Sequence, residues 1–546
     1  MRLSPIVVAL AALAVSPTAF AQTSPFDAAR LSEHIRVLSA DDFEGRGIAT
    51  PAEDKVIAYL SEQYAAAGLQ PGGEAGSWTQ AVALNRFTAS NVQASVTVGD
   101  WSQALTQGEQ IVVSTRRPGQ DRVALADAPL VFVGYGIHAP ERDWDDFKGQ
   151  DMTGKILVVL VNDADFEEPA LDTFGGKAMT YYGRWTYKYE EAARQGAAGV
   201  IIVHETEPAS YGWTTVRNSW SGANFDIVRA DADERVPLEA WIQRDLAVDL
   251  FQRAGLDFEA LKRSARSREF QPVALTGAAL DVGFDVAAET IETHNVIARL
   301  PGSTRPDETF LYTGHWDHIG VGTPDANGDA IFNGAVDNAS GTAGLLELAR
   351  VLGSGPAPER SVVFISFTAE ESGLLGSEYY AANPIYPLAT TVGGINMDSA
   401  NVYGRVKGMG VIGYGQSDLD DRLLPLVEAQ GRVIQPDANP ASGSYFRSDH
   451  FPLAKRGVPM AYVDSAGDFI DEPIAERTAE RDAYGANRYH QADDEWSADW
   501  DYAGQIQDLD LYLALGRSLV NSRDWPQWKA GSEFATVRAQ TSAERQ

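Results

Sequence analysis

The sequence predicts an α/β fold: a doubly wound, mostly parallel sheet flanked by helices, with an inserted β-rich domain. In the second half of the chain, apolar runs at 310–313, 362–367 and 394–397 alternate with helical repeats such as 343–352. That alternation is typical of parallel strands joined by crossover helices. Between residues 119 and 271 the pattern changes to closely spaced short strands, which indicates a separate compact unit.

The chain is too long for one ordinary core, since it has 546 residues. Hydrophobic residues make up 44% of it and aromatic residues 10%, which is enough material for packed cores. The expected divisions are a signal peptide (1–21), the N-terminal part of the main domain (22–118), the insert (119–271), the main part of that domain (272–528) and a polar flexible tail (529–546).

The first 21 residues have the features of a secretory signal. Arg2 precedes an apolar stretch at 6–15, and the segment 19–21 has the small-x-small pattern of a cleavage site, so the mature chain is expected to begin at Gln22. The alternative, a membrane anchor, is disfavoured because about ten apolar residues fall short of the roughly 20 that span a bilayer. We expect export to the periplasm or the extracellular space, and no membrane span in the mature chain.

Composition restricts the chemistry and the partners. The chain has no cysteine, so a metal site must use histidines and carboxylates, and disulfides are excluded. A formal net charge of −32 argues against a nucleic acid partner, because such binding relies on Lys and Arg neutralising phosphates.

Helices and strands can be assigned in both parts of the chain. A helix is expected from residue 51, because Thr50 and Glu53 have the spacing of a capping box and apolar residues then repeat at helical spacing. Its expected role is to cover the sheet. Within the insert, the runs at 130–133, 156–161 and 200–203 are expected strands, and 187–195 is an expected helix.

Polar side chains follow three of the predicted strands, close to where each apolar run stops. They are His315, the pair Glu370 and Glu371, and Asp398. In an open α/β sheet, ligands gather outside the carboxyl ends of the strands. These side chains are therefore expected to meet in one crevice.

The residue types in this crevice suit a pair of zinc ions. Zinc accepts His nitrogens and carboxylate oxygens, and two ions about 3.5–4 Å apart need a carboxylate that bridges them. Asp337 is the candidate bridge, because it lies in a Gly- and Asn-rich turn ahead of a predicted helix. One ion is then expected to take His315 and Asp398, and the other Glu371 and His490.

Glu370 and Glu371 are expected to have different roles, because neighbouring residues at a strand end point in different directions. Glu371 would bind metal, whereas Glu370 is the candidate general base for a water that bridges the two ions.

Further residues near these candidates have supporting or rival roles. Asp317 and Asp494 each stand a few residues past a histidine candidate and are expected to orient its imidazole. His450 ranks second to His490 as the fifth ligand, and His318 ranks below both as a structural residue.

These motifs resemble those of the co-catalytic dizinc exopeptidases, which include bacterial leucyl aminopeptidases and glutamate carboxypeptidases. The similar stretches are His315-x-Asp317, Gly334-Ala-x-Asp337-Asn338-Ala-Ser-Gly341, Glu370-Glu371, Asn396-Met-Asp398 and Tyr489-His490-x-x-x-Asp494, and the N-terminal stretch 42–47 is also similar. The resemblance implies a zinc exopeptidase-like fold, the ligands His315, Asp337, Glu371, Asp398 and His490, and Glu370 as the base. It also implies a cis peptide at Asp337-Asn338 and a hydrogen bond from Tyr489 to the developing oxyanion.

The insert resembles a protease-associated domain. The similar points are Gly134-Tyr-Gly136, Asp146-Phe147, Gly154-Lys155-Ile156 and Gly196-Ala-Ala-Gly199. Such inserts cover the cleft in some relatives, and whether Arg184 or Trp185 reaches a substrate stays open. The sequence departs from the family at Gln491, where many members have Thr, so the surroundings of His490 also stay open.

The leading hypothesis is an exported, zinc-dependent aminopeptidase with two Zn²⁺ per chain and a peptide substrate. A second hypothesis is a carboxypeptidase that clamps a C-terminal carboxylate through Arg447 or another cleft arginine. A third, from a different class, is a peptidase-like binding ectodomain without catalysis, against which the complete ligand set argues. Monomer and homodimer both stay open.

Overall fold

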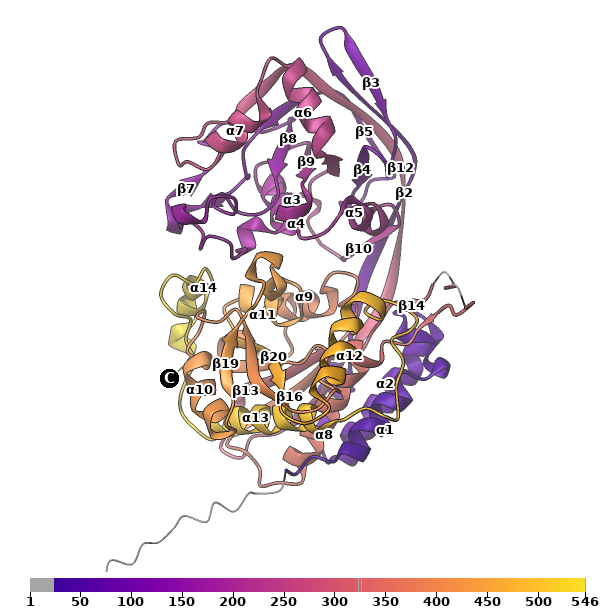
Figure 1. Cartoon of the computed structure of the whole chain (residues 1–546), viewed down its shortest axis with the longest axis vertical. Helices are drawn as coiled ribbons and strands as arrows, with labels where there is room; N and C mark the ends of the chain where they lie inside the picture. Colours follow the sequence, from indigo (N-terminus) through magenta and orange to yellow (C-terminus); the bar gives the residue numbers. More distant parts are fainter. Residues whose placement is uncertain (1–23, 323, 326, 546) are drawn as a thin grey trace, which may run out of the picture.

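The computed structural model describes residues 24–545 except 323 and 326, so the predicted signal peptide, residues 1–21, lies outside the described residues. Two lobes stand one above the other in Figure 1. We call residues 86–285 the upper lobe and the other described residues the lower lobe. A 16-stranded sheet runs through both lobes. Among the described helices, none combines the length and apolar character needed to cross a bilayer.

The lower lobe contains the mixed, mostly parallel part of this sheet. Its strands, in spatial order, are β19 (Val433–Pro436), β18 (Val406–Ile412), β20 (Met460–Phe469), β17 (Thr391–Asn396), β13 (Arg305–His315), β16 (Arg360–Phe367) and β12 (Val273–Leu300). The four central strands, β20, β17, β13 and β16, are mutually parallel. Their carboxyl ends therefore point to the same edge of the sheet.

Helices cover both faces of the lower sheet. On one face, α8 (Gly341–Gly353) and α13 (Ala503–Val520) pack on the sheet, with α1 (Ala28–Leu38) and α2 (Pro51–Ala66) beside α8. On the other face lie α9 (Leu375–Ala382) and α11 (His450–Lys455). Neighbouring residues of β13 divide between the faces, because Tyr312 packs in the cluster with α8 and α13 and Leu311 in the cluster with α9 and α11. The predicted doubly wound α/β class is confirmed.

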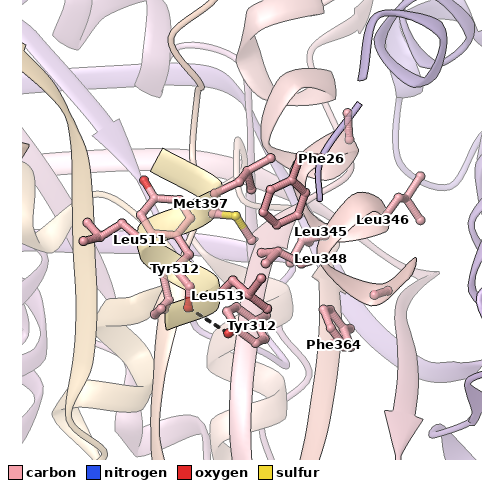
Figure 2. Close-up of a cluster of buried hydrophobic side chains, with 14 of the residues drawn as sticks. Phe26, Tyr312, Leu345, Leu346, Leu348, Phe364, Met397, Leu511, Tyr512 and Leu513 are labelled. Atoms are coloured by element: carbon pink, nitrogen blue, oxygen red, sulfur yellow. Dashed lines mark hydrogen bonds between the residues drawn. The ribbon is translucent and has the colours of Figure 1, made fainter. Parts of the chain in front are cut away.

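The core beneath the sheet fixes β13 against α13 (Figure 2). Tyr312 packs among apolar side chains of α8 and α13, and its hydroxyl donates a hydrogen bond to the carbonyl oxygen of Tyr512 at 2.9 Å. Gly516 permits this approach, because a Cβ atom there would lie 1.8 Å from the Tyr312 hydroxyl oxygen. This contact anchors the strand that ends at His315.

The upper lobe has its own parallel layer. Strands β5 (Arg122–Phe132), β8 (Ile156–Leu160), β9 (Gly199–His204) and β11 (Leu238–Gln243) are parallel, and β4 (Ile111–Ser114) pairs antiparallel with β11. Helix α3 (Trp185–Arg194) follows β8, and α6 (Arg244–Arg253) follows β11. Strand β4 lies before residue 119, where the predicted insert begins. The layer therefore includes part of the chain that precedes the predicted insert.

Two long strands connect the lobes. Strand β2 (Thr79–Val98) pairs antiparallel with β12 along nearly its whole length, from Thr79 opposite Val296 to Val98 opposite Ala278. The two strands run together from the lower lobe into the upper lobe in Figure 1. The sequence did not predict this pair, because its register joins residues that are 180 to 217 positions apart, from Val98–Ala278 to Thr79–Val296.

The predicted helix from Pro51 is present as α2, but its start differs from the prediction. The Thr50 hydroxyl donates to the carbonyl of Gly47, and the Glu53 carboxylate accepts from the backbone N–H of Ala49 at 2.7 Å. Glu53 also accepts from His294. The prediction of a capping box is therefore wrong, because the Glu53 carboxylate accepts hydrogen bonds from groups outside the helix.

The C-terminal segment 529–545 is packed, which corrects the prediction of a flexible tail. It contains α14 (Ala535–Gln540), and Phe534 and Arg538 are buried. The Arg538 guanidinium donates hydrogen bonds to the carbonyl oxygens of Thr391 and Val392 at the start of β17. The sequence predicted a flexible tail because this segment is polar. A buried arginine that donates hydrogen bonds to carbonyl oxygens cannot be told from a surface arginine by sequence alone.

Candidate metal centre

The structure brings all five predicted metal ligands together at the carboxyl ends of the lower strands. His315 is the last residue of β13, and Asp398 follows β17 by two residues. Asp337 lies in the turn Ala335–Ser340 ahead of α8, and Glu371 follows β16. His490 comes from the loop after α12 (Ile474–Asn487) and holds a left-handed backbone, with φ of +57°.

Asp337 lies between the two histidines. Its Oδ1 atom is 3.4 Å from Nε2 of His315, and its Oδ2 atom is 3.2 Å from Nε2 of His490. On the first side, His315 Nε2 is also 3.2 Å from Oδ1 of Asp398. On the second side, His490 Nε2 is 3.2 Å from Oε2 of Glu371.

These distances suit cations shared by the ligand atoms. Two atoms bound about 2.0–2.1 Å from a tetrahedral ion lie roughly 3.3 Å from each other. The ligand atoms on each side of Asp337 have that separation. The donor set therefore fits one cation position on each side, with Asp337 common to both.

His318 competes with His490 for the second position. One ligand atom from each of His318, Asp337 and Glu371 lies within 4.8 Å of the others, as in the group formed by His315, Asp337 and Asp398. However, His318 Nδ1 is only 2.7 Å from Oε1 of Glu371, which is a hydrogen-bond distance and shorter than two ligands of one tetrahedral ion allow. We therefore assign His318 to holding Glu371 and keep His490 as the ligand candidate.

His450, the other rival, lies outside this group. It is fully buried, and its ring centroid is 4.7 Å from those of Tyr445 and Tyr462. Neither ring nitrogen has a hydrogen-bond partner among the described residues. Burial lowers the pKa of His450 to about 3, so the ring is neutral and packs as an aromatic group.

The electrostatics of the centre couple its acids to its imidazoles. Burial lowers the pKa of His490, but contacts with Asp337 and Glu371 outweigh burial and raise the pKa to about 10. Burial raises the pKa of Asp337, yet the hydrogen bonds from His315 and His490 bring that pKa well below its usual range. The imidazoles thus hold positive charge between carboxylates, where a metal ion would compete with their protons.

Asp317 and Asp494 support the centre mainly through backbone contacts, which differ from the predicted role of Asp494. The Asp317 carboxylate accepts from the backbone N–H groups of Glu370 at 3.1 Å and Glu371 at 3.4 Å. Asp317 also contacts the ring of His315, through its backbone carbonyl at 3.1 Å from Nδ1, and its carboxylate Oδ1 lies 3.8 Å from the same nitrogen.

The hydrogen bonds described for the Asp494 carboxylate go to the turn that carries Asp337 and to Tyr484, and none of them goes to His490. The carboxylate accepts from the backbone N–H groups of Val336 at 3.0 Å and Asp337 at 3.1 Å, and from the hydroxyl of Tyr484. Sequence spacing suggested the histidines as partners, because it cannot show which backbone amides a loop brings near.

Other contacts at the centre were missed or only partly predicted. Ser448 donates to Oδ2 of Asp398 at 2.6 Å, and the buried Arg46 donates to the carbonyl of Asp337 at 3.3 Å. Nothing in the local pattern distinguishes Ser448 from a surface serine. The predicted cis peptide at Asp337-Asn338 is confirmed.

A cleft of about 440 Å³ opens beside the centre. Glu370, Glu371, Tyr489 and His490 line its lower side, and residues of the upper lobe, such as Trp185, line the other side. The ring of Tyr489 stacks on that of His490 with 3.9 Å between centroids. The cleft thus connects the candidate ligands and base with the upper lobe.

Comparisons with known proteins match the part of the chain that carries these residues. The sequence model of Peptidase family M28 matches residues 295–514. A probable zinc metalloprotease of Pyrenophora teres f. teres is 45% identical over 86 residues, which are 16% of this chain and 18% of that protein. A probable glutamate carboxypeptidase of Arabidopsis thaliana is 25% identical over 324 residues, 57% of this chain and 42% of that protein.

Among solved structures, an aminopeptidase from Aneurinibacillus sp. strain AM-1 has the same fold, with a TM-score of 0.50 and 19% identity over 91% of this chain and 95% of that one. The chain thus spans less than half of the length of the two curated relatives and nearly the whole length of this structural neighbour.

Proposed function

We propose that the chain is a zinc-dependent exopeptidase with aminopeptidase as its leading activity, on the basis of the match of residues 295–514 to the model of Peptidase family M28. The observation that carries the proposal is the arrangement around Asp337, whose two carboxylate oxygens face the imidazoles of two different histidines. A bridged metal pair needs one carboxylate with this placement.

The residues that would hold the two ions follow from the distances. His315 and Asp398 would hold one ion, Glu371 and His490 the other, and Asp337 both. All are nitrogen or oxygen donors of the kind that zinc accepts. When bound, a zinc pair polarises the scissile carbonyl and makes water a nucleophile at neutral pH.

Glu370 would move the proton. It lines the cleft beside Glu371, and its backbone N–H is fixed by Asp317. Burial raises the pKa of Glu370 well above its usual range, although His315 opposes this. A carboxylate with a raised pKa can take a proton from the attacking water and return it to the leaving amine.

Tyr489 would stabilise negative charge that develops on the carbonyl oxygen. It stands in the cleft next to His490 and is 47% exposed, so its hydroxyl can meet a bound peptide. A hydroxyl donor aimed at the developing oxyanion lowers the energy of the transition state.

The upper lobe would act as a protease-associated domain that covers the cleft. Trp185 and Arg184, at the start of α3, line the cleft opposite Tyr489 and His490. A volume of about 440 Å³ lies within the range of small-ligand pockets, which favours a short peptide or a chain end as substrate.

Two arginines in the cleft support a second candidate function, a carboxypeptidase. Nε of Arg184 is buried and has no hydrogen-bond partner among the described residues. Burial and the neighbouring Arg447 lower the pKa of Arg184 to about 10. Two adjacent guanidinium groups in a cleft would favour a substrate carboxylate.

Peptides blocked at one end separate the two candidates. We expect an N-acetylated peptide to resist cleavage and the matching C-terminal amide to be cleaved, because an aminopeptidase needs the free amine. The opposite pattern would establish the carboxypeptidase, and Arg184→Met should then raise KM. Absence of hydrolysis together with less than one bound zinc per chain would favour a binding ectodomain and contradict both.

We also propose export, from the signal-like segment 1–21. N-terminal sequencing of the protein from the producing cells is expected to begin at Gln22. A protein that retains Met1 and stays with the cytoplasmic fraction would contradict this assignment.

A further inference from the structure

We propose that Arg46 is a positioning residue that holds the backbone next to His315 and at Asp337 in the geometry needed for zinc. This inference rests on the proposed function. Arg46 comes from the N-terminal part of the chain, is 1% exposed, and does not line the cleft. Its position behind the ligands separates it from residues that touch substrate.

All five N–H groups of the Arg46 guanidinium are used, and every acceptor is a backbone carbonyl. Nε donates to Trp316 at 2.7 Å, directly after His315. One Nη donates to Leu38 at 2.9 Å and Asn333 at 2.6 Å, and the other to Gly334 at 2.8 Å and Asp337 at 3.3 Å. One side chain thus joins the end of β13 to the turn that presents the bridging carboxylate.

The backbone near Arg46 is shaped to deliver this side chain. Gly45 has φ of +63°, and a Cβ atom there would lie 2.5 Å from the carbonyl oxygen of Phe332 and 2.6 Å from that of Gly320. Arg46 itself has φ of +50°, a left-handed conformation that arginine rarely adopts. The segment is therefore held tightly against the chain just ahead of Asp337.

The contacts require a guanidinium. It has five N–H donors in a fixed plane, whereas a lysine ammonium has three around a single point. A lysine at this position cannot reach the carbonyl after His315 and those of the Asp337 turn at once. Burial lowers the pKa of Arg46 to about 10, and the nearby carboxylates of Asp337 and Asp494 oppose this, so the group stays charged at neutral pH.

The consequence concerns zinc affinity. Two ions share Asp337 only if its carboxylate stays between His315 and His490, and the carbonyl contacts of Arg46 fix the backbone on the His315 side and at Asp337 itself. Residues that orient metal ligands in this way typically change affinity by about 10–100-fold when replaced. We expect that range for Arg46→Lys.

Zinc affinity of the full chain, measured by competition with a chromophoric chelator, tests this role. Arg46→Lys and Arg46→Gln are compared with wild type, and Arg360→Lys is the matched control. Arg360 is also fully buried and donates to the carbonyls of Leu519 and Asp524, but it lies at the opposite end of β16. The cobalt-substituted proteins supply a second readout, because their visible spectra report ligand geometry.

We expect weaker zinc binding and a changed cobalt spectrum in both Arg46 variants, with Arg360→Lys like wild type in both. Equal zinc affinity in wild type and Arg46→Lys would overturn the inference, as would a loss of fold in both Arg46 variants while Arg360→Lys folds. A wild-type protein that takes up no zinc would contradict the proposed function instead.

Discussion

Two clusters of buried charged side chains, one around Asp163 in the upper lobe and one around Asp337 in the lower lobe, are satisfied differently. In the upper lobe, the Asp163 carboxylate accepts from the backbone N–H of Thr180 at 2.6 Å and from its hydroxyl at 2.8 Å. Lys188 donates to the carbonyls of Tyr135 and Asn162. In the lower lobe, the two carboxylate oxygens of Asp337 each lie 3.2–3.4 Å from an imidazole nitrogen, of His315 and of His490.

The difference shows how to recognise a site among buried charges. Burial raises the pKa of Asp163 to about 6 and lowers the pKa of Lys188 to about 8, so burial alone perturbs groups that have local backbone partners. At the metal centre, several acids and imidazoles lie at the mutual distances of ligands. Shared geometry among side chains, more than a perturbed pKa, indicates the functional cluster.

The largest effect is expected from removing the bridge. Asp337→Ala should lose bound zinc and peptidase activity, because both cation positions share this carboxylate. Zinc content by elemental analysis and the chelator-dependent shift in Tm measure the loss. The control Asp163→Ala should be less stable but keep its zinc, and zinc retained by Asp337→Ala would contradict the assignment.

Next in size is the loss of the base. Glu370→Gln should reduce kcat by about 10²–10⁴-fold, the contribution of a general base, because the amide cannot accept the proton. Zinc content should stay that of the wild type, since Glu371 and not Glu370 meets His490. Peptidase activity close to wild type in this variant would remove Glu370 from the mechanism.

Replacing Lys188 in the upper lobe should change the stability of the protein and nothing else. Lys188→Met leaves the carbonyls of Tyr135 and Asn162 without their donor and removes the cation near Asp163. We expect the free energy of unfolding to fall by about 3 kcal/mol. Urea unfolding measures the change, and a fall in zinc affinity of the folded variant would break the comparison between the lobes.

The smallest effect is expected on the pH dependence of stability, through His34, a packed histidine of the lower lobe. Burial lowers the pKa of His34 to about 4, whereas its ordinary value is 6.5. The unfolded chain therefore binds more protons between these values, and stability is lost as the pH falls from about 6.5 towards 4. Between pH 7 and pH 5, wild type should lose about 2 kcal/mol more than His34→Gln. Equal losses in urea unfolding would show that His34 is protonated in the folded protein.

Much of the lower lobe could be predicted because its signals are local. The apolar runs became parts of β13, β16 and β17, and the polar residues just after them met at one edge, as parallel strands require. The long pair of β2 and β12 was not predicted, because neither segment's own sequence indicates which distant segment it pairs with or in which register.

The residue types that form the metal centre could be predicted from the sequence. The contacts that hold those residues in place could not. Histidines and carboxylates at strand ends indicated a metal site without reference to their partners. The contacts of Asp317 and Asp494 with backbone N–H groups depend on how loops lie in space, and the sequence gives no sign of them. For the same reason Arg46 was seen only as part of a similar stretch.

The most direct test of the central claim is a crystal structure of the zinc-loaded protein with anomalous scattering at the zinc edge. We predict two peaks about 3.5–4 Å apart. One should be bound by His315 and Asp398 and the other by Glu371 and His490, with Asp337 between them. A single peak, or peaks away from Asp337, would contradict the account.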